Sequence, residues 1–116
     1  MNDQTATIDQ LKALVDAFVN ERNWQPFHDP KNLSASIAIE AAELMEHFQW
    51  LRSDELEAVR EDAVQMSEIR EELADIVAYV LSFATRMHID IASALEDKMK
   101  KNTIKYPVER YKGRFK

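Results

Sequence analysis

The sequence predicts an all-α protein, arranged as an antiparallel bundle of four main helices. Glycine occurs once and proline three times in 116 residues, which is too few for the many tight turns of a strand-rich fold. Apolar residues recur in several segments at the three- and four-residue spacing of one helix face. The length suits one compact domain, so we expect residues 1–116 to form a single domain.

A loop separates the first two predicted helices. Thr7 directly precedes the first predicted helix. Gln10 follows Thr7 by three residues, which is the spacing of a capping box. The apolar face of this helix consists of Ile8, Leu11, Val15, Phe18 and Val19. Residues 23–30, NWQPFHDP, contain two prolines and an aspartate, and therefore predict a loop. We expect the second helix to begin near residues 32–34 and to continue to about residue 51.

The second half of the chain predicts two more helices. Ser53 can cap a polar, weakly amphipathic connector, and the third helix is expected over residues 67–87. Asp90 can cap the fourth helix. Pro107 cannot continue a regular helix, so the tail over residues 107–116 is expected to be irregular.

The third helix is apolar over about half of its circumference. That surface is more than three neighbouring helices of this length can cover. We therefore expect a homo-oligomer, either a homodimer or a dimer-of-dimers tetramer. A monomer with a tight core is the alternative.

Charge is divided unevenly along the chain, whose net charge is −6. Residues 1–97 contain 20 acids and 7 basic residues, whereas residues 98–116 contain 8 basic residues and the single acid Glu109. An acidic body is repelled by a polyanion, so we expect no nucleic acid polymer as a partner. A small polyphosphate held between the acidic and the basic parts is compatible with this distribution.

Several other classes are disfavoured by composition. No apolar run approaches the roughly 20 residues that span a bilayer, so no membrane association is expected. The first ten residues carry acids and no basic cluster, unlike a signal or transit peptide. There is no cysteine, which leaves oxygen and nitrogen ligands for any metal. A cytoplasmic location is the default expectation.

Two pairs of acids mark the candidate site. Glu40 and Glu43 lie three residues apart in IEAAELMEHFQW, and Glu72 and Asp75 lie three residues apart in EELADIV. Residues at this spacing share a helix face, and none of the four has a basic residue four positions further on. If the two helices pack together, the four carboxylates converge and need a divalent cation, for which hard Mg²⁺ is suited. The alternative is that both pairs are ordinary solvated faces. No Glu-x-x-His occurs, which disfavours a di-iron site.

These motifs resemble the all-α nucleoside triphosphate pyrophosphohydrolases of the MazG-like superfamily. The stretches WQPFHDPKNLSASIAIEAAELMEHFQW, EELADIVAYVLSFA and KMKKNTIKYPVERYKG are similar to the dCTP pyrophosphatase branch. The resemblance implies cleavage between the α and β phosphates, which releases monophosphate and pyrophosphate. It also implies that Mg²⁺, or Mn²⁺ as a substitute, is held by the four catalytic acids Glu40, Glu43, Glu72 and Asp75. Which acid is the general base stays open.

The resemblance also implies residues that bind the nucleotide. It implies that the phosphates or the sugar are contacted by Tyr79, Lys98, Asn102 and Tyr106. Base contacts fall on Trp24, Phe27, His28 and Trp50. For the two tryptophans, a purely structural position in the core or an interface is the alternative, and for His28 it is a loop-capping hydrogen bond. The expected substrate is dCTP or a base-modified dCTP. A broad or dUTP-preferring enzyme and a non-catalytic helical metal-binding scaffold are the alternatives.

Overall fold

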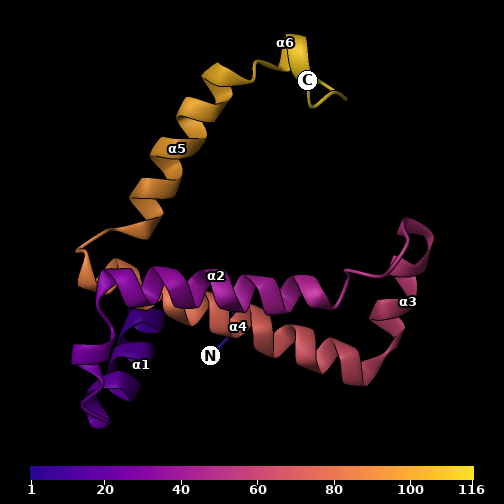
Figure 1. Ribbon diagram of the computed structural model, residues 1–116. Helices are drawn as coiled ribbons and strands as arrows, with labels where there is room; N and C mark the ends of the chain where they lie inside the picture. The colour runs from indigo at the N-terminus through magenta and orange to yellow at the C-terminus, as the bar shows by residue number, and fades with distance from the viewer.

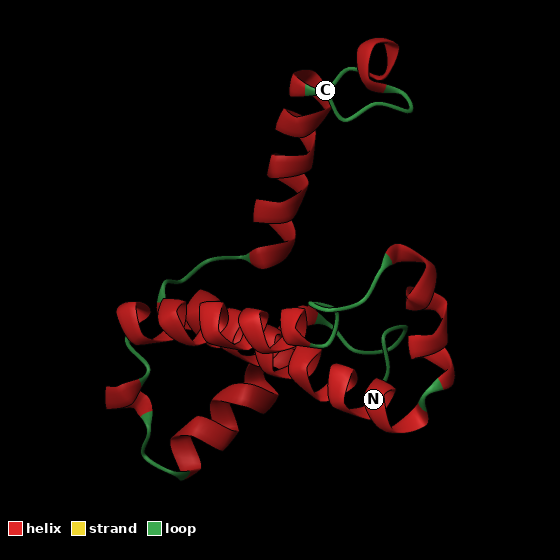
Figure 2. Cartoon of the chain, turned by 45° about the vertical axis from the view of Figure 1, so that its right-hand side comes forward, coloured by secondary structure: helices red, strands yellow, loops and turns green.

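The computed structural model describes residues 1–116 and contains helices, turns and loops without a strand (Figure 2). The predicted all-α class is therefore confirmed. The helices are α1 (Ile8–Glu21), η1 (Gln25–Phe27), α2 (Pro30–Glu46), η2 (Ser53–Glu55), α3 (Leu56–Glu61), α4 (Ala63–Arg86), α5 (Ile91–Lys105) and α6 (Val108–Tyr111). None of them combines the length and the apolar content that crossing a bilayer requires.

The body of the molecule, α1 to α4, is built around one antiparallel helix pair. Helices α2 and α4 run side by side in opposite directions, and α1 packs against α4 (Figure 1). The buried apolar residues of these three helices are Val19, Leu33, Leu81 and Ala84. This pairing brings the middle of α2 next to the first half of α4, which carries the second pair of acids.

Two predicted helix caps are confirmed. At α1, the Thr7 hydroxyl accepts a hydrogen bond from the Gln10 amide at 3.2 Å, and the Gln10 side-chain oxygen accepts one from the Thr7 amide at 2.9 Å. At α5, the Asp90 carboxylate accepts a hydrogen bond from the Ser93 amide at 2.8 Å. Each side chain satisfies an amide that has no partner within its helix.

The predicted bounds of the second helix are wrong at both ends. Asp29 caps α2 by accepting from the Asn32 amide at 2.8 Å. Pro30 occupies the first turn, where its missing N–H costs nothing. The helix ends at Glu46 because the next amides bond three residues back, His47 to Leu44 and Phe48 to Met45, and so tighten into turns.

The later bounds also differ from the prediction. Helix α4 begins at Ala63, because Asp62 caps it by accepting from the Gln65 amide at 3.1 Å. The connector before it divides into η2 and α3, and Ser53 lies inside η2 rather than capping it. The tail is not wholly irregular, because α6 follows Pro107, which occupies the N-cap position and needs no amide there.

Helices α1 and α4 end in the same backbone motif. Asn23 after α1 and His88 after α4 have φ of 53° and 54°, and the following amides, of Trp24 and Ile89, bond back across the last turn at 3.1 and 2.9 Å. This is a Schellman motif, for which glycine is the usual residue at positive φ. The Lys12 ammonium also donates to the Ile89 carbonyl at 2.8 Å.

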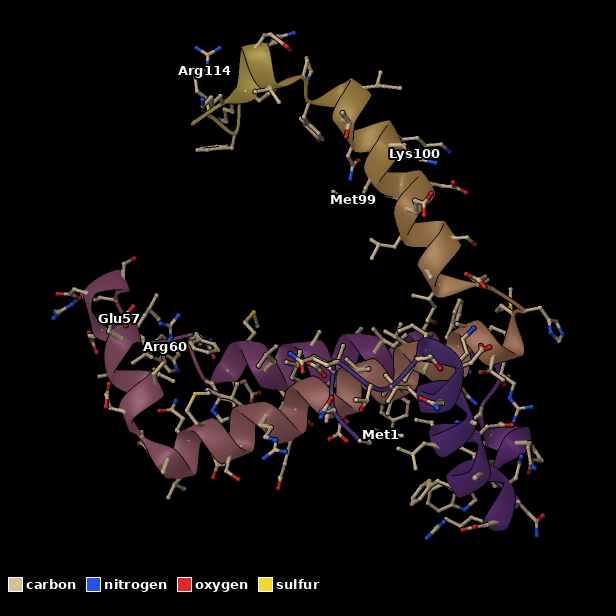
Figure 3. All side chains as sticks on the ribbon, turned by 180° about the vertical axis from the view of Figure 1, so that it is seen from behind. Met1, Glu57, Arg60, Met99, Lys100 and Arg114 are labelled. Carbon is tan, nitrogen blue, oxygen red and sulfur yellow. The ribbon has the colours of Figure 1, made fainter.

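The arm, α5 and α6, leaves the body and packs against no part of it along its length (Figures 1 and 2). Neither helix contains a buried residue. Met99 and Lys100 project from α5 without reaching another helix (Figure 3). The predicted bundle of four main helices is therefore not closed within one chain, since α5 does not join α1, α2 and α4, and only the short α3 packs on α4 besides them.

Candidate active site

Three of the four predicted acids meet between α2 and α4. One carboxylate oxygen from each of Glu40, Glu43 and Glu72 lies within 4.8 Å of the other two. Glu40 and Glu43 share a face of α2 because they are three residues apart. The antiparallel pairing brings Glu72 of α4 against that face. Two helices thus supply one cluster of carboxylates.

Asp75 lies one turn beyond Glu72 on α4, at the border of this cluster. Its carboxylate is exposed and is not one of the three that meet. Its negative charge nevertheless contributes to raising the pKa of Glu40 and of Glu72. Asp75 therefore belongs to the same electrostatic unit, while its part as a metal ligand stays a prediction.

The cluster is short of positive charge and of hydrogen-bond donors. Oε2 of Glu40 and Oε2 of Glu72 are buried and have no hydrogen-bond partner, and no ion pair in the molecule involves any of the four acids. Burial first, then hydrogen bonding to Glu72 and Glu43 and the charges of Glu43 and Asp75, raise the pKa of Glu40 to about 7. In the absence of a cation, the Glu40 carboxyl therefore titrates near neutral pH.

The pKa of Glu72 is also raised, against an opposing effect. Hydrogen bonding to a protonated Glu40 lowers the pKa of Glu72 and is the largest single contribution, but burial, Glu43 and the charge of Asp75 together outweigh it. Both shifts reflect carboxylates that lack a counter-charge. A hard divalent cation fits this set, because every donor is a carboxylate oxygen and two of the oxygens are unsatisfied.

A hollow lined by Glu43, Glu46, His47 and Glu72 adjoins the cluster. Sequence reasoning missed Glu46 as a site residue, although it follows Glu43 by three residues just as Glu43 follows Glu40. That repeated spacing was the available signal. The His47 side chain also lines the hollow, while its carbonyl accepts a hydrogen bond from Gln65 at 3.3 Å.

Tyr79 and His28 form the next part of the α4 face. Tyr79 lies one turn beyond Asp75, and its ring centroid is 6.4 Å from that of His28, at a tilt of 36°. Burial and then the positive charge of Arg86 lower the pKa of His28, and both effects favour the neutral imidazole. The structure thus brings these two predicted residues together, and adds Arg86, which sequence reasoning missed because no motif surrounds it.

The predicted aromatic residues do not gather in one pocket within the chain. Trp24 packs edge-on against Phe18, with ring centroids 5.7 Å apart. Phe27 and Trp50 are 67% and 84% exposed. Trp24 and Trp50 lie beyond opposite ends of α2, whose 17 residues span roughly 25 Å. One chain therefore cannot place both tryptophans on the same base.

The predicted phosphate-binding residues of the arm lie apart from the acids. Lys98 and Asn102 are on α5, and Asn102 donates only to the Met99 sulfur, at 3.8 Å. Tyr106 follows α5 and packs against Tyr111, with centroids 5.2 Å apart. None of these side chains bonds to the body, so their part in the site stays a prediction.

Comparison with known proteins gives consistent matches. Residues 35–116 match the model of the MazG-like family. Mouse dCTP pyrophosphatase 1 is 34% identical over 107 residues, which are 92% of this chain and 63% of the mouse protein. The human protein of the same name is 33% identical over 87% of this chain and 59% of its own length. The chain thus spans less than two thirds of these relatives. The crystal structure of a pyrophosphatase from Archaeoglobus fulgidus superposes with a TM-score of 0.79, at 36% identity, and covers 92% of this chain and 98% of that one.

Proposed function

The chain belongs to the MazG-like family, and we propose that it hydrolyses nucleoside triphosphates to monophosphate and pyrophosphate with the help of Mg²⁺. The observation that carries this proposal is the carboxylate cluster. Three carboxylates from two helices lie within 4.8 Å of one another, and two of their oxygens are buried without a partner. Such a set binds a divalent cation, and Mg²⁺ in proteins usually bridges carboxylates and phosphates.

The chemistry of each side chain in the site indicates its role in the proposed reaction. Glu40, Glu43 and Glu72, with Asp75 beside them, would hold the cation, which would supply positive charge to the phosphate oxygens and Lewis acidity toward the attacking water. A carboxylate that is left free of the cation accepts a proton from the attacking water, and Glu46 joins the original four as a candidate. Tyr79, one turn further along α4, offers a hydroxyl to the sugar or a phosphate.

We propose dCTP or a base-modified dCTP as the substrate, in a role of cleaning the nucleotide pool. The support is the name shared by the curated relatives, dCTP pyrophosphatase 1, at 33–34% identity. A broad or dUTP-preferring pyrophosphohydrolase is the enzymatic alternative. A non-catalytic scaffold that binds metal is the alternative from another class, and such a site would leave no open position for phosphate or water.

A substrate panel tests the proposal. Each dNTP and NTP is incubated with the protein and Mg²⁺, and pyrophosphate and orthophosphate are measured separately. We expect pyrophosphate, with the highest kcat/KM for dCTP, and no release in EDTA. Failure to cleave any nucleotide would defeat the enzyme, and orthophosphate as the first product would defeat the cleavage position.

We further propose that the working unit is a homo-oligomer. A compact monomer of 13.5 kDa exposes roughly 6,500 Å², whereas this chain exposes 9,496 Å². Its radius of gyration is 17.4 Å, against about 13 Å for a compact domain of this length. The excess surface is of the size that obligate oligomers bury.

Charge and geometry favour a second copy of the chain as the occupant of this surface. The arm is basic and the body is acidic, so the arm of one copy is complementary to the carboxylate cluster of another. Lys98 and Asn102 would then reach the phosphates across the interface. A base pocket that uses both Trp24 and Trp50 also needs two copies, because α2 separates the two side chains.

Mixing two inactive variants tests this shared site. Glu43→Gln damages the cluster and Lys98→Ala damages the arm. If each site takes the cluster from one copy and the arm from another, a refolded equimolar mixture of dimers regains about a quarter of the wild-type sites, from random pairing of two isologous subunits. If both residues act within one chain, the mixture regains none.

A further inference from the structure

Arg86 is half-buried, and one nitrogen of its guanidinium group has no partner in the protein. Its Nη2 atom is buried without a hydrogen-bond partner, and Arg86 takes part in none of the ion pairs, although the chain contains 21 acids. An arginine in such a place normally has a carboxylate or carbonyl acceptor, because an unpaired buried N–H is penalised. An acceptor from outside the chain would remove this penalty.

Arg86 does not play the ordinary role of an arginine at this position. Basic residues in the last turn of a helix often donate to its final carbonyls. At the end of α4, the amides of His88 and Ile89 occupy the carbonyls of Thr85 and Ala84. Arg86 donates to none of them, so capping does not explain its burial.

His28 presents a second unpartnered polar atom beside Arg86. Its Nδ1 is buried and has no hydrogen-bond partner, and the nearby charge of Arg86 helps to lower its pKa. The loop that carries it is fixed, because the Asn32 side chain donates to the Phe27 carbonyl at 3.2 Å and Asp29 caps α2. Two segments of the chain therefore direct unsatisfied polar atoms into one region.

The order of side chains along α4 indicates which part of a nucleotide reaches this region. Glu72, Asp75, Tyr79 and Arg86 occur at spacings of three, four and seven residues, which is one face of the helix. Asp75 and Arg86 are separated by a rise of roughly 16 Å, and a helical side chain leans back toward the N-terminus, which shortens the gap. A nucleotide bound by its phosphates at the acids would place its sugar near Tyr79 and its base near Arg86.

We propose that Arg86, with His28 beside it, recognises the edge of the nucleobase and selects cytosine. This inference rests on the proposed function. Arginine can only donate hydrogen bonds, and cytosine presents two adjacent acceptors, O2 and N3. In thymine and uracil N3 carries a hydrogen, which would face the guanidinium donor. A site built around such a donor rejects the wrong base because the buried group is left unpaired.

The test compares Arg86→Met, which keeps the length of the side chain without its donors, with wild type on dCTP and dTTP. We expect kcat/KM for dCTP to fall about 10- to 100-fold, as for loss of a hydrogen bond with a charged donor, and the value for dTTP to change less than about threefold. Arg60→Met is the control, since Arg60 is exposed on α3 and pairs only with Glu57. An equal loss on every dNTP, or no loss, would overturn base recognition.

Binding of the product separates this inference from the proposed function. Calorimetry with dCMP and dTMP in Mg²⁺ needs no turnover, because neither carries a phosphate anhydride to cleave, and we expect wild type to prefer dCMP and Arg86→Met to lose that preference. If wild type binds dCMP but cleaves no triphosphate, the proposed function fails and the inference survives. If wild type shows no preference between the two, the inference fails. Should Arg86→Met unfold, Arg86→Gln replaces it, because the glutamine amide can accept from thymine N3–H as well as donate to cytosine: with an unchanged melting temperature, an undiminished dCMP preference would refute the role.

Discussion

In the body, α2 and α4 pack against each other and bury Leu33 and Leu81, whereas α5 in the arm buries no residue. The charges differ as well, since the body carries the acid cluster, whereas residues 98–116 carry 8 of the 15 basic side chains and a single acid. An isolated helix of 15 residues is marginal in water. What supports α5 within the chain is its Asp90 cap and an exposed Glu96–Lys100 ion pair at 3.1 Å, which contributes less than about 1 kcal/mol.

This difference teaches that the body of one chain positions the acids, while the predicted phosphate-binding residues lie outside that packed body. The body positions the acids without any contact from the arm, because the antiparallel pair of α2 and α4 alone brings Glu40, Glu43 and Glu72 together. The basic side chains that would bind the phosphates are on α5, which does not pack against the helices of the body. Perturbing the body should therefore alter folding or metal binding, while perturbing the arm should alter assembly.

The largest effect is expected on activity, from Glu43→Gln in the body. Removing one charge from the cluster weakens cation binding, and we expect kcat/KM for dCTP to fall at least about 100-fold with an unchanged circular dichroism spectrum. Glu71→Gln, an exposed acid on α4, is the matched control and should keep its activity. Activity within tenfold of wild type in Glu43→Gln would contradict the metal role of the cluster.

Two leucine truncations contrast the body with the arm directly. Leu33 is only 1% exposed, so Leu33→Ala should cost about 2–5 kcal/mol of unfolding free energy, measured by chemical denaturation. Leu95 on α5 is 59% exposed within the chain, and Leu95→Ala should instead weaken the oligomer, measured by sedimentation across a dilution series. An unchanged assembly in Leu95→Ala would mean that this face of α5 is not at the interface.

The pH dependence of stability should reverse when Mg²⁺ is added. The pKa of Glu40 is raised to about 7, above its unfolded value of about 4.3, so between these values the folded state holds more protons than the unfolded state. In EDTA, stability should be greatest at the acid end of this window and should decline as the pH rises through 7. If Mg²⁺ binds the cluster as proposed, it binds the deprotonated carboxylates and should therefore stabilise most at high pH.

Thermal unfolding at pH 5.5 and pH 8, in EDTA and in Mg²⁺, measures both slopes. Glu40→Gln is the control and should flatten the dependence in EDTA, since it removes the titrating group. Equal melting temperatures of wild type at the two pH values in EDTA would show that the cluster does not hold an extra proton.

The smallest effect is expected at the junction between body and arm. His88 has a φ of 54°, which glycine adopts at no steric cost. His88→Gly should therefore raise the unfolding free energy by about 0.5–1 kcal/mol. His47→Gly is the contrasting variant, because His47 has a φ of −62° and gains nothing from glycine. A loss of stability in His88→Gly would contradict the assignment of strain to this turn.

The spacing of residues was sufficient to predict the helical class, the Thr7 and Asp90 caps and the convergence of three acids. Periodicity and capping are local properties, and an i, i+3 pair stays on one face whatever surrounds it. Asp29 and Pro30 were read as breakers of structure although they begin α2. Proline suits both a loop and a first helical turn, and its letter alone does not distinguish the two.

The remaining differences depend on three-dimensional packing. The apolar positions of α5 predict that something covers them, but the pattern does not say whether the cover is the same chain or another. The sequence around Arg86 did not predict a functional role. The feature that marks this residue is a buried nitrogen without a hydrogen-bond partner, and that arises only when α4 and the loop around His28 are folded. The wide separation of Trp24 and Trp50 likewise follows from the straight course of α2 between them.

The turn at His88 and the Lys12–Ile89 hydrogen bond set the direction in which α5 leaves the body. Helix α5 has 15 residues and is roughly 22 Å long. A small rotation at the turn near His88 therefore produces a larger displacement at the far end of the helix. A swing of about 10° there would move the far end by roughly 4 Å and Lys98, half-way along, by roughly 2 Å. If the arm meets a neighbouring copy as proposed, a substitution at Lys12 on α1 would thus change where the predicted phosphate-binding side chains arrive in that copy.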